Sequence, residues 1–177
     1  LNHASLHFYG HAEAVTRVRG STPPPGSDMV LDKLSDFGCS DHRSIVTWNG
    51  KAVYANTEGV YMTDGINTAN LIEAGFVELY YQTLLASYAT SWELNAGVYR
   101  DYYFLCITDG PGGTFQDCLV CELRKRVWFR FQNFSFRGFA EGKVGGFQGL
   151  FAACGDQSRL AKLNGIFAPV AGNKADA

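Results

Sequence analysis

Three histidines near the start of the chain have a spacing that metal ligands can have. His3, His7 and His11 recur every four residues, which places them on one face of a helix and also on one face of a strand. Imidazole nitrogens in such a row suit a transition metal. No cysteine or carboxylate arrangement accompanies them, so a polar surface or a chance cluster is favoured over a metal site.

A second candidate is Cys118-Leu-Val-Cys121, the C-x-x-C spacing of redox and zinc sites. Here the pair falls inside a predicted strand, Phe115–Leu123, where residues three apart point to opposite faces. We therefore expect buried free thiols. Five scattered cysteines indicate a reducing compartment more than a disulfide framework. The other three cysteines are interpreted as ordinary small apolar residues: Cys39, Cys106 and Cys154.

The acidic residues are dispersed along the chain. A glycoside hydrolase needs two carboxylates that converge on one bond, and a calcium loop needs a central glycine among its acidic ligands. Convergence is not visible in a sequence, Asp64 and Asp109 already have turn roles, and no Gly-centred calcium loop follows Asp28, Asp32 and Asp36. We therefore expect no catalytic residue, cofactor or metal from this set: Asp28, Asp32, Asp36, Asp41, Asp64, Asp101, Asp109, Asp117 and Glu122.

Phosphate and nucleic-acid signals are weak. No Gly-rich phosphate loop precedes a helix, and no G-x-S-x-G motif occurs. The basic run Arg124-Lys125-Arg126 is short, so a hairpin tip in water is favoured over a phosphate contact. A net charge of −2 with 18% charged residues fits neither a nucleic-acid coat nor a disordered tail. No apolar run approaches the roughly 20 residues of a membrane helix, and no signal peptide is visible.

Strands must position most of these residues. Aromatic residues make up 14% of the chain and glycine occurs 20 times, which favours an all-β fold. One helix is predicted over residues 70–88, because Ile72, Phe76, Tyr80 and Leu84 lie four apart. The predicted strands are Ala14–Arg19, Ser44–Trp48, Lys51–Asn56, Gly59–Thr63, Val98–Ile107, Phe115–Leu123, Val127–Phe131, Phe134–Phe139, Gly149–Ala153 and Arg159–Lys162.

A repeat explains how these strands bury their faces. Val53–Asn56, Tyr103–Cys106 and Leu150–Ala153 share aromatic and small residues, and they are 50 and 47 residues apart. A period of roughly 40–50 residues with several strands per unit is typical of β-propeller blades. The hairpin Gly50–Gly65, which turns at Asn56–Gly59, would then pack against neighbouring blades. A sandwich or barrel with coincidental spacing is the alternative.

Three regions follow from this interpretation. Residues 1–43 form an irregular segment with one possible strand and a Pro-rich linker around Pro23–Pro25, with a fourth blade as the alternative. Residues 44–168 hold the blades and the helix, and residues 169–177 form a loose tail. Three to four blades barely reach the roughly four to eight that close a ring. The chain also begins at Leu1. We expect processing, trimming or a longer parent, or a ring completed by another segment or subunit.

The run Gly38–Val46, followed by Asn49–Gly65, resembles β-propeller proteins of tailed-phage virions. In those proteins a Gly-Val-Tyr…Asp-Gly hairpin precedes a short helix, as here, and Ala96–Tyr103 resembles the start of the next blade. The resemblance covers roughly residues 38–167. It implies a structural protein of the virion, assembled in the bacterial cytoplasm, at the head–tail connector or tail. Portal, connector or tail subunits would be its partners, commonly in a homo-oligomeric ring, without catalytic residues.

Three functions compete. A structural protein would act through its interfaces, with loops such as Asp109–Gly113 and the segment Pro23–Pro25 making contacts. A glycan- or receptor-binding module would need exposed aromatic residues, but the tryptophans recur at spacings of 44 and 36, which suits packing between blades better. A glycan hydrolase, the third, would need a carboxylate pair in the channel. The tryptophans are Trp48, Trp92 and Trp128.

Overall fold

The computed structural model is mostly β, with one α-helix among the residues that it describes. The described ranges are 8–11, 14–19, 30–35, 37–72, 76–87, 92–108, 115–132, 136–144, 146–154 and 160–163. Four antiparallel sheets account for all the strands, and each is a meander in which neighbours in sequence are neighbours in space. The prediction of an all-β chain with one short helix is therefore confirmed.

The sheets follow one another along the sequence. Sheet A contains β1 (Phe8–His11), β2 (Ala14–Arg19) and β3 (Val30–Ser35). Sheet B contains β4 (Val46–Trp48), β5 (Lys51–Ala55), β6 (Val60–Thr63) and β7 (Thr68–Asn70). Sheet C contains β8 (Glu93–Tyr99), β9 (Tyr102–Thr108), β10 (Phe115–Glu122) and β11 (Val127–Gln132). Sheet D contains β12 (Phe136–Val144), β13 (Phe147–Cys154) and β14 (Leu160–Lys162). A 3₁₀ turn, η1 (His42–Ser44), precedes β4, and the helix α1 (Phe76–Ser87) separates sheets B and C.

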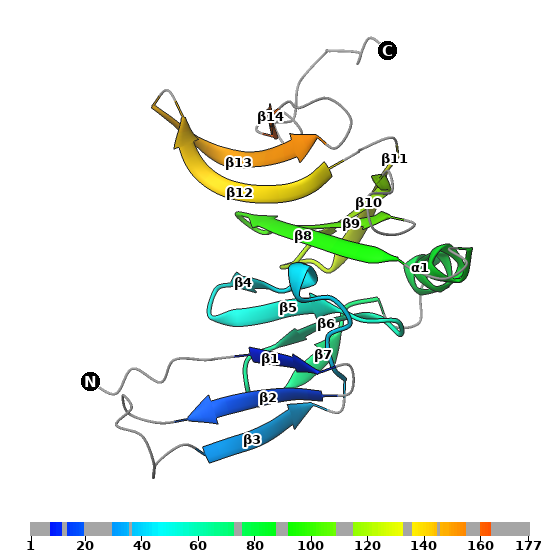
Figure 1. Cartoon of the computed structure of the whole chain (residues 1–177), viewed down its shortest axis with the longest axis vertical. Coiled ribbons are helices and arrows are strands. Elements are labelled where there is room, and N and C mark those ends of the chain that lie inside the picture. The colour runs from blue at the N-terminus through cyan, green and yellow to red at the C-terminus, as the bar shows by residue number, and fades with distance from the viewer. Residues whose placement is uncertain are drawn as a thin grey trace.

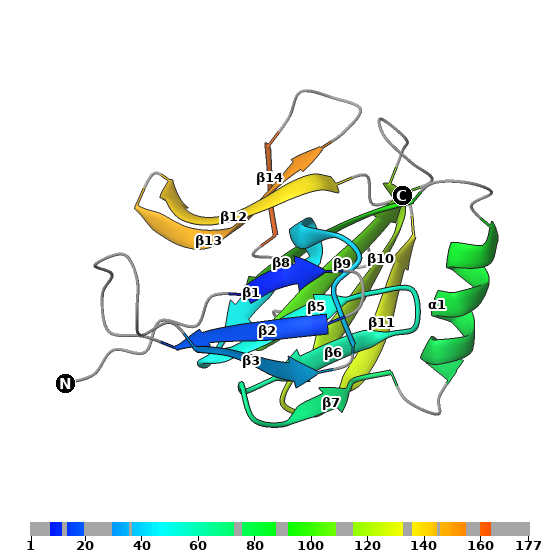
Figure 2. The same ribbon diagram turned by 60° about the horizontal axis from the view of Figure 1, so that its bottom comes forward.

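The four sheets are stacked face to face in sequence order. Figure 1 shows sheet D at the top, then sheets C and B, and sheet A at the bottom. Figure 2 shows the strands of sheet C fanning out behind sheet B. In both views α1 lies at one side of the stack, next to sheets B and C. The repeated segments predicted from the sequence begin in β5, β9 and β13, which are the second strands of three consecutive sheets.

Sheet C is buried on both faces, which the interior strand β9 shows most clearly. Tyr103, Leu105 and Ile107 of β9 belong to a cluster shared with sheet B. Phe104 and Cys106, which alternate with them, belong to a cluster shared with sheet D. Because successive side chains of a strand point to opposite faces, a continuous apolar run satisfies both neighbours at once. All five side chains are at most 2% exposed.

Side chains of sheet B also alternate between its two faces, and they show what the Gly50–Gly65 hairpin packs against. Val53 of β5 and Val60 of β6 face sheet C. Tyr54 and Tyr61 face the opposite direction, where they pack with Cys39. The hairpin turns at residues 56–59 as predicted, with Asn56 N donating to Gly59 O over 2.9 Å. The amide oxygen of Asn56 accepts two further hydrogen bonds from the same turn.

The helix α1 fills the space between the outer parts of sheets B and C. Tyr81 is fully buried and its hydroxyl donates to Asn56 O over 2.6 Å. Leu85 packs in the same cluster, whereas Leu79 on the opposite side is 68% exposed. Burial of a leucine side chain such as that of Leu85 stabilises the folded state by about 2–3 kcal/mol. No helix in the described part of the chain is long and apolar enough to cross a membrane.

Two boundaries differ from the sequence predictions. Val98–Ile107 was predicted as one strand, but the chain reverses at Arg100 and Asp101 and so forms β8 and β9. Arg100 adopts a left-handed conformation with φ of 56°, without the Gly or Asn that normally marks such a turn. The predicted helix at 70–88 begins at Phe76, because β7 pairs with β6 up to Asn70. The amide oxygen of Asn70 then accepts from Ile72 N.

The N-terminal region is more regular than the irregular segment predicted for residues 1–43. Three strands, β1 to β3, pair there as sheet A, where the sequence indicated only Ala14–Arg19. β1 is only four residues long, so its alternation is too short to recognise. The loops around Pro23–Pro25 and Asp109–Gly113 and the tail 169–177 lie outside the described residues.

Candidate functional site

The prediction of buried free thiols is confirmed for the C-x-x-C pair, whereas the side chain of Cys154 lies outside the described part of the structure. Cys118 and Cys121 both lie in β10 and are free and buried. Cys118 packs toward sheet D and Cys121 toward sheet B, so the two thiols lie on opposite faces and form no joint site. Burial raises the pKa of Cys121 to about 12, which keeps it a neutral thiol. Cys39 and Cys106 are also free and buried.

The histidine row yields no visible site. His3 and His7 lie outside the described residues, and His11 is known only as the last residue of β1. Among the residues that the structure describes, no group of three or more His, Cys, Asp and Glu side chains could hold a metal ion. Asp28 and Asp36 are likewise outside the described ranges, and Asp32 is known only as part of β3.

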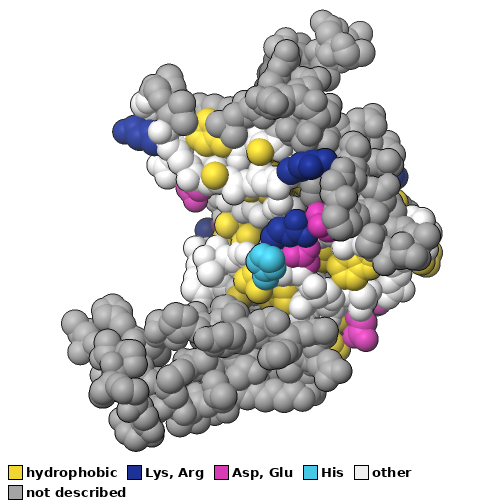
Figure 3. Space-filling model, viewed as in Figure 1, with side chains coloured by type: hydrophobic (Ala, Val, Ile, Leu, Met, Phe, Trp, Pro, Cys, Tyr) yellow, Lys and Arg dark blue, Asp and Glu magenta, His cyan; other side chains and the backbone are white. Residues whose placement is uncertain are grey.

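Asp41 is the centre of a polar cluster that the sequence did not reveal. Its carboxylate accepts from Arg43 N at 3.0 Å, from Arg43 Nη2 at 2.8 Å and from Leu94 N at 3.1 Å. Arg43 Nη1 also donates to Glu93 Oε2 at 3.0 Å. Figure 3, which shows the molecule from the same side as Figure 1, has acidic, basic and histidine side chains gathered near its middle. The cluster ties the turn before sheet B to the first strand of sheet C.

Protonation of this cluster is set by its geometry. Burial opposes ionisation of Asp41, but the hydrogen bonds from Arg43 and Leu94 outweigh it and hold the pKa of this carboxyl below its ordinary value. Hydrogen bonds to Asp41 and Glu93 raise the pKa of Arg43. His42 lies 3.7 Å from Asp41 with 87% of its side chain exposed. The carboxylate is therefore occupied by donors from its own chain.

The other acidic candidates are also used between strands or sheets. Asp101 accepts from Trp48 Nε1 at 3.2 Å and pairs with Arg124 at 2.8 Å. Asp117 pairs with Arg130 at 3.0 Å. Glu122 and Asp64 stabilise the turns beside them. Glu122 pairs with Lys125, and Asp64 accepts hydrogen bonds from the backbone N–H groups of the two residues after Gly65. The expected basic hairpin tip is confirmed, because residues 124–126 are exposed between β10 and β11. Asp109 lies outside the described residues.

The tryptophans pack between sheets, as their spacing predicted. Trp48, Trp92 and Trp128 are half-buried against the cluster between sheets B and C. The indole N–H of Trp128 donates to Leu71 O over 2.9 Å. Their rings are therefore engaged in the interior more than they are presented to a ligand.

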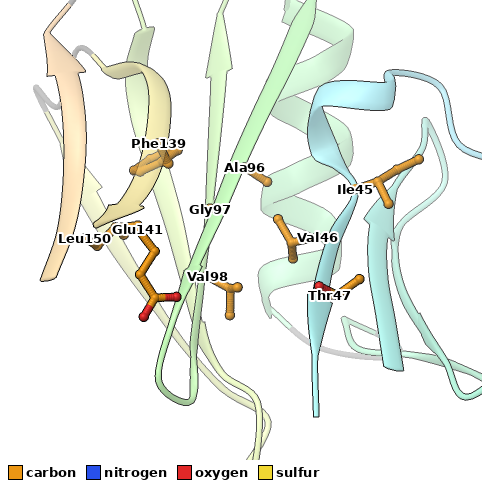
Figure 4. A pocket seen from close by; sticks show the side chains of 9 residues that line it. All are labelled: Ile45, Val46, Thr47, Ala96, Gly97, Val98, Phe139, Glu141 and Leu150. Atoms are coloured by element: carbon orange, nitrogen blue, oxygen red, sulfur yellow. The ribbon is translucent and has the colours of Figure 1, made fainter. Parts of the chain in front are cut away.

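A groove runs along the first strands of three sheets. Figure 4 shows β8 in its middle, with Ala96 and Val98 toward β4, and Phe139 and Glu141 projecting from β12. The cavity volume is about 450 Å³, and Glu141 is the only acidic residue among the described residues of its lining. These are Ile45, Val46, Thr47, Ala96, Gly97, Val98, Phe139, Glu141 and Leu150.

Close contacts hold the first strands together along this groove. A Cβ atom added to Gly97 would lie 2.4 Å from the Cβ of Phe139, so only glycine allows β8 and β12 to approach this closely. Asn95 Nδ2 donates to the carbonyl of Arg137 across the same gap. The sequence gave no sign of this contact, because the predicted strand began only at Val98 and Phe139 is 42 residues beyond Gly97.

No family model matches this sequence, and no curated protein matches it either.

Proposed function

We propose that this protein is a structural component of a tailed-phage virion, in which its four sheets act as propeller-type blades and its surfaces bind neighbouring subunits. The observation that carries the proposal is the burial of sheet C on both faces. In a propeller, blades are stacked around an axis and each interior blade is covered on both sides. A sandwich sheet has one interior face only.

The direction of the chain within the sheets supports the blade interpretation. β4, β8 and β12 are the first strands of sheets B, C and D, and all three line the groove. β8 and β12 approach closely at Gly97 and Asn95, which brings the first strands of sheets C and D together. Between sheets B and C, α1 and Trp128 fill the space at the other side of the stack. We infer from this that the first strands lie nearest to a common axis.

The chemistry of the described residues supports action through interfaces. Asp41, Asp101 and Asp117 have donors within the chain, and the described thiols are buried. Large apolar side chains remain exposed at several places, among them Ile66 at 78% and Leu79 at 68%. Contacts between subunits commonly bury apolar side chains of the protein surface at their centre. The assignment to a virion, at the head–tail connector or tail, depends on the resemblance of residues 38–167.

Assembly tests this proposal directly. Sedimentation velocity at concentrations from about 1 to 100 µM, with negative-stain images of the same samples, should show ring-shaped or larger homo-oligomers. Exposed side chains provide the variant: I66D/L79D should sediment as a monomer with an unchanged circular dichroism spectrum. A monodisperse monomer of the wild-type chain over the whole range would contradict the proposal.

A glycan- or receptor-binding function is the second candidate, and the groove of about 450 Å³ is the observation that favours it. Its lining contains one aromatic residue, Phe139, whereas the tryptophans that could stack on sugars pack between the sheets. A glycan array would decide: binding that is lost in Phe139→Leu supports this second function, and the absence of hits removes it. For hydrolysis, the lining offers a single carboxylate where two are needed.

A further inference from the structure

Two thiols face each other across the middle of sheet C. Cys106 of β9 and Cys118 of β10 are direct partners in the antiparallel register. Both side chains point toward sheet D and pack in the same cluster. Residues directly opposite in an antiparallel pair have Cα atoms about 4.5–5.5 Å apart. This separation lies within the roughly 4.4–6.8 Å that a disulfide spans.

The other described thiols lack such a partner. Cys121 lies opposite Tyr103 on one side and Trp128 on the other. Cys39 has Ser44 as its polar neighbour, with Sγ and Oγ 3.3 Å apart. Pairing of thiols across strands is therefore specific to Cys106 and Cys118 among the four described, and it does not involve the C-x-x-C spacing that the sequence presents.

We propose that Cys106 and Cys118 are a modification site, at which a cross-strand disulfide forms when the chain folds in the presence of a disulfide oxidant. The bond would join β9 to β10 on the face that sheet D covers. It would also make a covalently closed loop of the chain between the two cysteines. This proposal is independent of the proposed function, since it depends only on the register of sheet C.

The reaction is thiol–disulfide exchange with a small disulfide such as oxidised glutathione. One cysteine loses its proton, and its thiolate attacks the glutathione disulfide, which forms a mixed disulfide and releases one glutathione. The second cysteine, also deprotonated, then attacks the protein sulfur of the mixed disulfide and releases a second glutathione. Two cysteines are thus oxidised by two electrons, and one glutathione disulfide is reduced to two thiols.

Burial determines when this reaction can occur. Cys106 is 0% exposed and Cys118 is 1% exposed, so a small oxidant does not reach them in the folded chain. Burial also raises the pKa of Cys106, which disfavours the reactive thiolate. The β9–β10 hairpin is local in sequence, so its strands can pair before sheet D covers them. The bond is therefore expected during folding.

Refolding provides the test. The reduced chain is unfolded in guanidinium chloride and refolded with a mixture of reduced and oxidised glutathione, and remaining thiols are alkylated. Asp-N and trypsin then separate Cys106, in peptide 101–108, from Cys118 and Cys121, in peptide 117–124. We expect these two peptides to be linked, and we expect the refolded, oxidised protein to melt about 5–10 °C above the reduced protein.

Matched variants identify the sulfur atoms. Cys121→Ser, in the same strand but on the other face, should keep the link, and Cys118→Ser should lose it. Near-ultraviolet circular dichroism checks that each variant is folded. If a variant does not fold, fragmentation of the linked wild-type peptides in the mass spectrometer decides, because a fragment that separates Cys118 from Cys121 shows which of the two carries the link. Full alkylation of Cys106 in refolded wild-type protein, or its link to Cys121 or another cysteine, would overturn the proposal.

Discussion

At the residue scale, single polar side chains connect sheets that are far apart in sequence. Ser44 of η1 shows this most clearly: its hydroxyl accepts from Ala55 N of β5 at 3.1 Å, and its backbone carbonyl accepts from the Tyr103 hydroxyl of sheet C at 3.0 Å. Burial of these groups is tolerated because each has a partner. Residues 38–46 include this serine and part of the Asp41 cluster, so their role in the structure is to connect sheets.

Asp41→Asn should destabilise the fold by about 2 kcal/mol at pH 7, because hydrogen bonds to a charged group are lost or weakened. The pKa of Asp41 is lower in the folded chain than in the unfolded chain, so its contribution is complete above about pH 5 and is lost as the pH falls through the lowered pKa. Urea unfolding at pH 7 and at pH 3 checks both statements.

The control for Asp41 is Glu58→Gln on the exposed β5–β6 turn, which should leave the free energy of unfolding within about 0.5 kcal/mol. The difference between wild type and Asp41→Asn should shrink toward pH 3. An equal difference at both pH values would show that the carboxylate charge is not what stabilises this turn.

Gly97→Ala should destabilise the fold by roughly 1–3 kcal/mol, because the added methyl group meets the Cβ of Phe139 and forces β8 and β12 apart. Gly138→Ala in β12 is the matched control, since nothing lies within 4 Å of its added Cβ. Thermal unfolding of both variants measures the effect. Equal melting temperatures for the two would mean that the first strands do not approach each other as described.

At the scale of the elements, α1 contributes through one face only. Tyr81→Ala should cost about 3–5 kcal/mol because it leaves a cavity between sheets B and C. Tyr81→Phe should cost about 1 kcal/mol, the value of its hydrogen bond to Asn56 O. Leu79→Ala, on the exposed face, serves as the control. Denaturant unfolding that ranks the three variants in another order would contradict the packing of α1.

The sequence predicts the elements better than it predicts their contacts. Strong local signals, such as the Asn49-Gly50 turn with both φ values positive, are reproduced in the structure. Turns without glycine, such as Arg100-Asp101, carry no such signal, so two strands were predicted as one. The Asp41 cluster, the Gly97–Phe139 contact and the Cys106–Cys118 pair all depend on which strands become neighbours, and spacing along the chain does not encode that.

At the scale of the whole molecule, the proposed propeller-type arrangement requires an uninterrupted stack of sheets. Sheet C uses the two faces of its strands for two different neighbours, sheets B and D, so a stack of this kind can be extended by a further sheet at either end. Sheets A and D lie at opposite ends of the stack (Figure 1). Our proposal that the protein assembles with other subunits depends on this geometry.

The contacts of two adjacent residues in β9 test this claim most directly. We predict that a NOESY spectrum shows Tyr103 ring protons close to residues of sheet B, near Ser44, with which its hydroxyl bonds. The same spectrum should show the Phe104 ring close to Phe139 of sheet D, since their ring centres are 5.8 Å apart, and Phe139→Leu should remove those cross-peaks. If both rings contact the same sheet, or if one has no partner outside sheet C, the stacked arrangement is contradicted.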